Sequence, residues 1–237
     1  MDIAKVIDYT LLKPQEPLGS YTELVRNAIK YQVGTVCVNS FHVPLVSSLL
    51  HSYIHTDTNL NINVASTIGF PFGTSSIESK VAEMQQAFND GAVEFDVVIN
   101  LSAVKTHDWL RVKHELEALR SAVPDFINKF HPTLKIILEV GMLTDDEIKK
   151  ASELCIETNC DFLKTSTGIN VELAPAKTAE YVRMLKDFSK GSKIKVKASG
   201  YIKTLSDFNM MLDAGADRIG VSRTVQILEE FLKGEKR

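Results

Sequence analysis

The feature of this sequence that most restricts its fold is a unit that occurs eight times: a short apolar or β-branched run, a loop, and an amphipathic helical pattern. The runs predict strands at residues 6–12, 33–39, 63–69, 93–100, 134–140, 161–166, 194–199 and 218–222. The helical patterns that follow them cover residues 21–31, 43–51, 75–90, 109–122, 145–158, 174–189, 205–214 and 224–233. Thr144 suits a helix start, and Gly91 and Gly215 suit helix ends.

Strands that alternate with helices imply a parallel sheet joined by right-handed crossovers, and eight such units close into a (β/α)8 barrel. We therefore predict an α/β fold, a single TIM barrel that forms one catalytic domain over residues 1–237. An open doubly wound sheet is the alternative, although no G-x-G-x-x-G motif follows the first strand. In a barrel, the chemistry is expected at the C-terminal ends of the strands and in the loops after them.

The net charge of the chain and its cysteines indicate which binding partners and which cellular compartment to expect. A net charge of −3 gives no field that would attract nucleic acid or an anionic membrane, so we expect neither as a partner. Three cysteines without a C-x-x-C pair favour reduced thiols in a cytoplasmic protein. The histidines lack metal-ligand spacing, so we expect no metal site. We also expect no signal peptide and no membrane-spanning segment.

The strand predicted at residues 161–166 contains a lysine, which a buried strand rarely accommodates. Burying an ammonium group is unfavourable unless the group is paired or its pKa falls. The alternation of side chains along a strand places Lys164 toward the barrel interior, and on the next strand it places Lys197 there too. The neighbouring cation and burial would both lower the pKa of Lys164, which would then attack a carbonyl to form a Schiff base.

Schiff-base chemistry also needs a group that moves protons, and Asp96 on the strand at 93–100 is our candidate. A carboxylate on so apolar a strand is not expected to be a surface charge. The alternative is that Asp96, Lys164 and Lys197 form a structural ion-pair network that does no chemistry. The residues alone leave both interpretations open.

Further candidates for substrate contacts come from strand parity and strand ends. The other strands have inward positions that suit substrate or supporting contacts at Asp8, Thr10, Cys37, Lys135 and Glu139. Cys37 is better explained as a small buried apolar residue, and we expect Lys195 to be structural, paired with Glu94. The end of the lysine strand adds Thr165 and Gly168 as candidates.

A substrate phosphate is expected at the loops after strands seven and eight, where barrels commonly bind one. The first of these loops offers Gly200, and the second offers Gly220, Ser222 and Arg223 immediately before the last predicted helix. Backbone N–H groups at a helix start favour an anion, and the hydroxyl and guanidinium groups add donors.

Several collinear stretches carry these candidates: IDYTLLKP (7–14), VCVN (36–39), IGFP (68–71), EFDVVIN (94–100), KIILE (135–139), DFLKTSTG (161–168), VKASG (196–200) and RIGVS (218–222). Together they resemble the deoxyribose-phosphate aldolase family nearly from end to end. The resemblance implies reversible cleavage of 2-deoxy-D-ribose 5-phosphate to D-glyceraldehyde 3-phosphate and acetaldehyde, without a metal or organic cofactor. It assigns the Schiff base to Lys164, its perturbation to Lys197 and proton transfer to Asp96, and it implies a homodimer.

Two positions depart from the family pattern. Tyr201 follows Gly200 where the family usually has a second glycine, and Arg223 follows Ser222 where it usually has a second serine. Tyr201 adds bulk near the expected phosphate, while Arg223 can bind a phosphate with two hydrogen bonds. A Schiff-base aldolase with a different aldehyde or sugar-phosphate substrate therefore stays open, as does a non-catalytic barrel that binds a phosphorylated metabolite.

Overall fold

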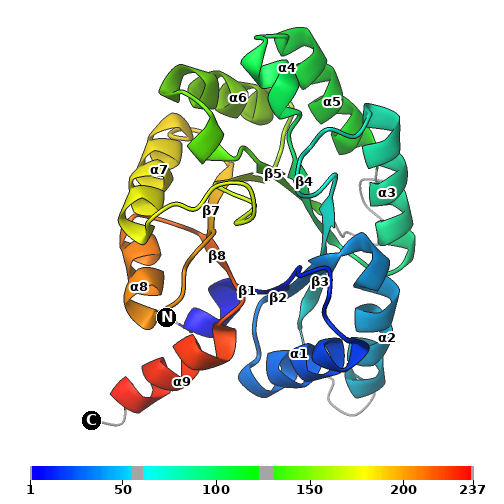
Figure 1. The fold of residues 1–237 in the computed structure, drawn as a ribbon, viewed down its shortest axis with the longest axis vertical. Helices are drawn as coiled ribbons and strands as arrows, with labels where there is room; N and C mark the ends of the chain where they lie inside the picture. Colours follow the sequence, from blue (N-terminus) through cyan, green and yellow to red (C-terminus); the bar gives the residue numbers. More distant parts are fainter. Residues whose placement is uncertain (1, 55–60, 123–130, 236–237) are drawn as a thin grey trace.

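The chain folds as a closed barrel of eight parallel strands surrounded by helices (Figure 1). The computed structural model describes residues 2–54, 61–122 and 131–235. Each strand pairs with the next along the chain, and β1 closes the ring against β8. The strands are β1 (Ile7–Leu11), β2 (Thr35–Asn39), β3 (Asn63–Ile68), β4 (Glu94–Val98), β5 (Thr133–Ile137), β6 (Phe162–Lys164), β7 (Lys195–Ser199) and β8 (Arg218–Val221). The predicted TIM barrel is confirmed, and the open sheet is excluded.

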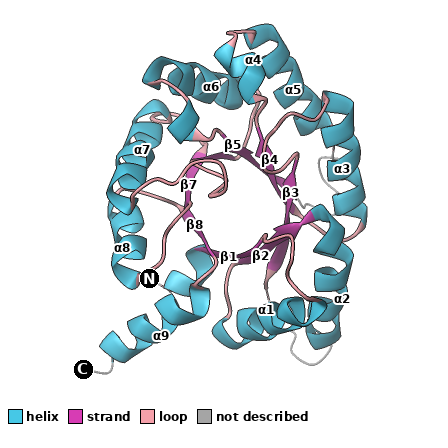
Figure 2. Cartoon of the chain, viewed as in Figure 1, coloured by secondary structure: helices cyan, strands magenta, loops and turns pink. Residues whose placement is uncertain are grey.

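The helices form an outer ring around the strands (Figure 2). They are α1 (Leu18–Tyr31), α2 (Val43–Ile54), α3 (Ile77–Asn89), α4 (Leu101–Lys105), α5 (Trp109–Ser121), α6 (Asp145–Glu157), α7 (Pro175–Phe188), α8 (Leu205–Asp213) and α9 (Thr224–Glu235). Short 3-10 helices lie at η1 (Ile3–Val6), η2 (Ser40–His42) and η3 (Val140–Met142). Thr144 caps α6 as predicted, because its side chain accepts a hydrogen bond from the Glu147 N–H. Gly91 and Gly215 follow helix ends with φ of 107° and 98°.

Three strands end two or three residues earlier than predicted. The strand expected at 134–140 ends at Ile137, and Glu139, with a φ of 53°, precedes η3. The other two early ends share one cause. The strand expected at 93–100 ends at Val98, because Asn100 accepts a hydrogen bond from the Ala103 N–H and starts α4, a helix that we did not predict. The strand expected to reach residue 166 ends at Lys164. The next residue, Thr165, instead donates its hydroxyl to the backbone oxygen of Ser199. Hydroxyl and amide side chains that compete for backbone partners explain both early ends.

The apolar core lies between the strands and the helices. Residues of the main hydrophobic cluster alternate along the strands, as Phe95 and Val97 do on β4 and Leu163 does on β6. The residues between them, such as Asp96 and Lys164, point into the barrel. Apolar packing therefore fixes the strands from outside and leaves the barrel interior to polar side chains.

The segment between β6 and α7 curls across the barrel mouth (Figure 1). Glu139 anchors this segment, because its carboxylate accepts hydrogen bonds from the N–H and hydroxyl of Thr167 and from the amide of Asn170. The same amide donates to the backbone oxygen of Pro71 at 2.8 Å, which ties the segment to the loop after β3. Within the described residues, no helix has the length and apolar character needed to cross a membrane.

Candidate active site

Seven charged side chains of the described chain meet inside the barrel, and we call them the inner network. They are Asp8, Glu94, Asp96, Lys135, Lys164, Lys197 and Arg218. Strand register explains the meeting, because Asp96 lies opposite Lys135 on β4 and β5, and Lys164 lies opposite Lys197 on β6 and β7. The structure therefore brings together the three residues to which the sequence assigned chemistry.

Asp96 is the centre of the inner network. Its Oδ2 lies 2.7 Å from the Lys164 Nζ and 2.6 Å from the Lys197 Nζ, and its Oδ1 accepts from the Lys135 Nζ at 3.0 Å. Burial alone would raise the pKa of Asp96, but attraction to these three lysines outweighs it and holds the pKa well below its usual range. Asp96 is therefore an ionised acceptor placed between two amines.

A second carboxylate, Asp8, holds the other cations in place. It accepts from Lys197, from the Lys135 Nζ at 3.2 Å, and it pairs with the Arg218 Nε at 3.1 Å. Burial opposes the charge of Lys197, yet the carboxylates of Asp8 and Asp96 outweigh this and raise the pKa of Lys197 above its ordinary value. The charged form of Lys197 is thus favoured next to Lys164.

Glu94 completes the network at the base of the barrel. Its carboxylate oxygens Oε1 and Oε2 accept hydrogen bonds from the Arg218 Nη2 at 2.9 and 3.0 Å, and the carboxylate also forms a salt bridge with Lys135. The predicted pairing of Lys195 with Glu94 is therefore wrong, because Arg218 and Lys135 occupy that carboxylate. Lys195 starts β7 in an exposed position, with its Nζ 5.8 Å from the centre of the Phe162 ring.

Lys164 differs from the other cations of the inner network. Its pKa is lowered, chiefly by burial and further by repulsion from Lys197, against the attraction of Asp96. Both causes were expected from the sequence, and burial is the larger of the two. Charge balance points the same way, because three carboxylates face four cations in the network. A neutral Lys164 leaves three charges of each sign.

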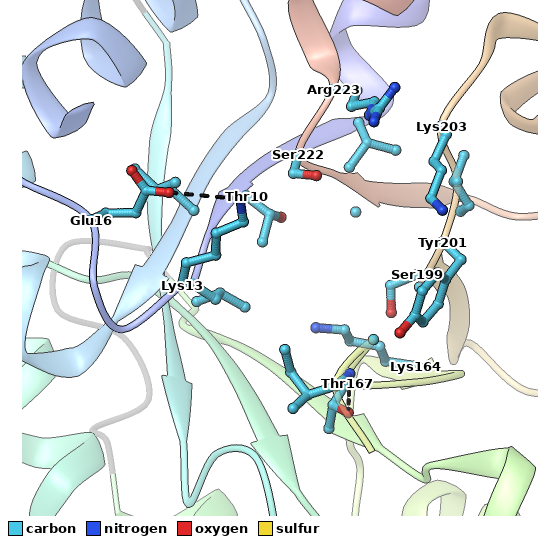
Figure 3. A pocket seen from close by; sticks show the side chains of 18 residues that line it. Thr10, Lys13, Glu16, Lys164, Thr167, Ser199, Tyr201, Lys203, Ser222 and Arg223 are labelled. Carbon is cyan, nitrogen blue, oxygen red and sulfur yellow. Dashed lines mark hydrogen bonds and ion pairs between the residues drawn. The ribbon is translucent and has the colours of Figure 1, made fainter. Parts of the chain in front are cut away.

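Lys164 is also the member of the described inner network that reaches a cavity. A cavity of about 520 Å³ at the barrel mouth is lined by Lys164 and by loops after β1, β6, β7 and β8 (Figure 3). Lys164 retains 3% of its exposure, whereas Lys197 and Lys135 are fully buried and lie outside the lining. The amine with the lowered pKa is thus the one that a ligand can reach.

The other end of this cavity is cationic. Lys13, Lys203 and Arg223 line it from three different loops, and Glu16 is the carboxylate among the lining residues (Figure 3). Lys13 is largely exposed and lies 3.9 Å from Glu16. Arg223 directly precedes α9, whose first N–H groups favour an anion. The cavity therefore combines an amine at one end with an anion-attracting rim at the other.

Most predicted substrate contacts line this cavity. Besides Glu139, whose carboxylate holds the segment after β6, four do not. Those that line it are Thr10, Gly168, Gly200, Gly220, Ser222 and Arg223. Asp8 and Lys135 are buried in the inner network, where they pair with each other and with Asp96. The Thr165 hydroxyl bonds to the Ser199 backbone, because parity turns this residue away from the barrel interior. These three side chains therefore lie beneath or behind the cavity, in positions that suit supporting roles.

Cys37 is the fourth predicted contact outside the cavity lining. It is fully buried on β2, and its Sγ lies 3.9 Å from the Asp96 Oδ2. Burial, with the charge of Asp96, raises the pKa of this thiol to about 11. A protonated thiol packed against the network agrees with the interpretation of Cys37 as a small buried residue.

Sequence reasoning missed several charged residues of the site. Lys13 and Lys203 follow the ends of β1 and β7, and their position after strand ends was an available signal. Arg218 was also missed, although it shares strand parity with Gly220 and Ser222. Across the described ranges, no group of three or more His, Cys, Asp or Glu side chains has an arrangement that could hold a metal ion.

Comparison with known proteins assigns this arrangement to a family. A sequence model of the DeoC/LacD family aldolases matches residues 8–223. The chain belongs to the DeoC/LacD aldolase family. The deoxyribose-phosphate aldolase of Aquifex aeolicus is 41% identical over 98% of both chains. A solved aldolase structure called QR15 superposes with a TM-score of 0.85 at 40% identity, covering 99% of this chain and 98% of the other.

A more distant relative retains the same architecture. The deoxyribose phosphate aldolase of Aeropyrum pernix, described as tetrameric, superposes with a TM-score of 0.82 at 29% identity, covering 97% of this chain and 90% of that one. The residues matched by the DeoC/LacD family model begin at Asp8 and end at Arg223. The part of the chain that the family model matches therefore includes all residues of the inner network and of the cationic rim.

Proposed function

We propose that this DeoC/LacD family aldolase is a class I enzyme that cleaves 2-deoxy-D-ribose 5-phosphate reversibly to D-glyceraldehyde 3-phosphate and acetaldehyde. The observation that carries the proposal is the position of Lys164: a buried amine with a lowered pKa that opens into a cavity with a cationic rim. Relatives named deoxyribose-phosphate aldolase, about 40% identical over nearly the whole chain, support the choice of substrate.

The first step is attack of the neutral Lys164 amine on C1 of the open-chain aldehyde. Loss of water gives an iminium ion that can accept an electron pair. Lys164 and Asp96 share a hydrogen bond of 2.7 Å, so the carboxylate is placed to accept a proton from the amine as it adds. Lys197 stays charged beside them and disfavours the ammonium form of Lys164.

The second step breaks the bond between C2 and C3. The C3 hydroxyl loses its proton and becomes the aldehyde of glyceraldehyde 3-phosphate, while the bonding electrons move into the iminium to give an enamine. Asp96, directly or through a water, is our candidate for the base. Protonation of the enamine at C2 restores the iminium, and water then releases acetaldehyde and the free Lys164 amine.

The phosphate is held at the cationic rim. Arg223 presents a fork of donors that matches a phosphate, while Lys13 and Lys203 supply positive charge from two other loops. The anion at the rim and the aldehyde at Lys164 would orient the substrate along the cavity. This arrangement separates recognition of the phosphate from the bond that reacts.

Borohydride trapping tests the mechanism. Protein incubated with acetaldehyde and sodium borohydride should gain the mass of a reduced two-carbon adduct, and peptide mapping should place it on Lys164. Lys164→Arg, which keeps a cation at this position, should gain no adduct. An adduct-free wild-type protein with a native circular dichroism spectrum would contradict the Schiff base and favour the alternative of a barrel that binds a phosphorylated metabolite.

We also propose a cytoplasmic enzyme that acts as a homo-oligomer and uses no metal or organic cofactor. Three free, buried cysteines support a reducing compartment. The tetrameric relative from Aeropyrum pernix supports an oligomer, and the sequence resemblance favours a dimer. Light scattering would give the mass in solution, and full activity after dialysis against a chelator would support the cofactor-free reaction.

The whole chain is proposed to be one catalytic domain, since residues 8–223 match the family model and the barrel closes between β1 and β8. Limited proteolysis that yields a stable fragment with an intact active site would contradict this.

A further inference from the structure

Tyr201 combines a strained backbone with a side chain that lines the Lys164 cavity. Its φ is 55°, in the left-handed region where side chains other than that of glycine are disfavoured. It directly follows Gly200, whose φ is 96°. A glycine would adopt the conformation of Tyr201 without steric cost. The tyrosine side chain is therefore present although it makes this backbone conformation less favourable.

The surroundings of the turn force this conformation. On one side, Ser199 is fixed because its N–H and backbone oxygen both bond to the Thr165 hydroxyl. On the other side, the Asp207 carboxylate accepts the N–H groups of Lys203 and Thr204 at 3.0 Å each, as α8 begins. Only three residues connect these fixed points. The chain must therefore turn sharply, and the direction of the Tyr201 side chain is set by the backbone.

That direction is into the substrate cavity. Figure 3 shows the Tyr201 ring on the β7 side of the cavity, with its hydroxyl end toward Lys164 and Lys203 at its other end. The Lys203 Nζ lies 5.1 Å from the ring centre, which places the ammonium group over the aromatic face. The ring thus stands between the reactive amine and one cation of the phosphate-attracting rim.

We infer that Tyr201 sets the length of the phosphorylated aldehyde that the cavity accepts. The inference rests on the proposed function, in which C1 reaches Lys164 and the phosphate reaches the rim. Because a fixed turn anchors the ring, the cavity has one length between the Lys164 amine and the phosphate-attracting rim. The substrate class selected is the five-carbon 2-deoxy aldose phosphate, and a six-carbon homologue would have to fold against the ring.

Specificity constants for two substrates test this inference. We would measure kcat/KM for cleavage of 2-deoxyribose 5-phosphate and of 2-deoxyglucose 6-phosphate, which carries one more carbon between the aldehyde and the phosphate. The wild type should prefer the five-carbon substrate. Tyr201→Gly should lower this preference by about tenfold or more, the discrimination that one carbon unit in a shaped pocket provides. Tyr201→Phe should keep the wild-type preference, because it keeps the ring.

Two further variants separate length selection from other roles. Lys203→Met should lower kcat/KM for both phosphates to a similar extent and leave their ratio unchanged. Tyr201→Asn, which tolerates the left-handed conformation, provides a second truncation if the glycine variant folds poorly. Tyr201→Gly should itself keep Tm within about 3 °C, because relief of strain offsets the greater freedom of glycine in the unfolded chain.

The outcomes separate this inference from the proposed function. A Tyr201→Gly or Tyr201→Asn enzyme that is folded and active, yet has the wild-type ratio, overturns length selection alone. Tyr201→Phe with the same loss of preference as Tyr201→Gly also overturns it, because the hydroxyl would then be the selective group. A wild type that cleaves neither sugar phosphate overturns the proposed function together with the inference.

Discussion

Two buried lysines of this barrel, Lys164 and Lys80, show what makes an amine reactive. Lys80, on α3, is fully buried between helices and donates to Glu115 and to the backbone oxygen of Val98 at 2.7 Å. Lys164, on β6, is nearly as buried and also has a carboxylate partner, Asp96. Burial and a salt bridge are therefore common to both residues and do not distinguish the nucleophile.

The difference lies in the surrounding charges and in access. Glu115 is the carboxylate partner of Lys80, and its other oxygen accepts the N–H of Asn100, so the pair is locally balanced. Asp96 is shared by three lysines, which leaves Lys164 as the cation in excess. Lys164 also lines the substrate cavity, whereas Lys80 lies outside that lining. Among the lysines that the structure describes, Lys164 alone both shares its carboxylate with other lysines and lines the substrate cavity.

The largest expected effect is on activity. Lys164→Met should lower kcat/KM by at least about three orders of magnitude, because the covalent intermediate is lost. Lys80→Met, a matched removal of a buried ammonium group, should keep kcat/KM close to the wild-type value at a temperature where the protein is folded. The measurement is coupled detection of glyceraldehyde 3-phosphate. Strong inactivation by the Lys80 change in a folded protein would contradict the assignment of the nucleophile to Lys164 by its shared carboxylate and its access to the cavity.

The second prediction concerns the free energy of unfolding of the Lys80 variant. Lys80→Met leaves Glu115 charged and buried without its partner, which should destabilise the fold by about 3–5 kcal/mol. A double variant, Lys80→Met with Glu115→Leu, should recover most of this loss, because removing both charges is often neutral. Denaturant unfolding followed by circular dichroism measures both. Equal losses in the single and double variants would show that packing, not the unpaired charge, dominates at this position.

Buried charged residues were easier to predict on the strands than on the helices. Because side chains alternate on a strand, Lys164, Lys197 and Asp96 could be placed inside the barrel from sequence alone. The same type of signal existed for Lys80, which lies on one helical stripe with Ile77 and Met84. Because a lysine on a helix is usually solvated, the burial of Lys80 was not predicted.

The rim was harder to predict than the network, because loop direction depends on tertiary contacts. Lys203 illustrates this. The Asp207 carboxylate at the start of α8 accepts the Lys203 N–H, which helps to set where Lys203 lies. This contact has no periodic pattern in the sequence. Strands have a fixed alternation, whereas a loop takes its direction from the partners available at its two ends.

Removing Asp96 and removing Lys197 should shift the pH dependence of activity in opposite directions. Asp96 raises the pKa of Lys164 and Lys197 lowers it, while burial, the largest influence, also lowers it. In Asp96→Asn the acid limb of the kcat/KM profile should therefore move to lower pH, and in Lys197→Met to higher pH. Asp96→Asn should also lose about 10²–10⁴-fold in rate as proton transfer is impaired. Shifts in the same direction would refute the assignment of these charges.

The smallest expected effect concerns the stability of the active site itself. The pKa of Lys164 is lower in the folded state than in the unfolded state. Such a lysine destabilises the fold at every pH at which the unfolded chain binds more protons than the folded chain. That penalty vanishes above the unfolded pKa of about 10.4, grows as pH falls toward the folded pKa and is constant below it.

Lys164→Met removes this penalty and should raise Tm at pH 7 by about 2–4 °C, the shift that about 1 kcal/mol produces in a chain of this size. The gain should shrink as pH approaches 10.5, whereas Lys80→Met should lower Tm throughout. Differential scanning fluorimetry across this pH range measures both variants. A Lys164→Met protein that is less stable than the wild type at pH 7 would indicate that the bond to Asp96 contributes more to the fold than burial of the amine removes.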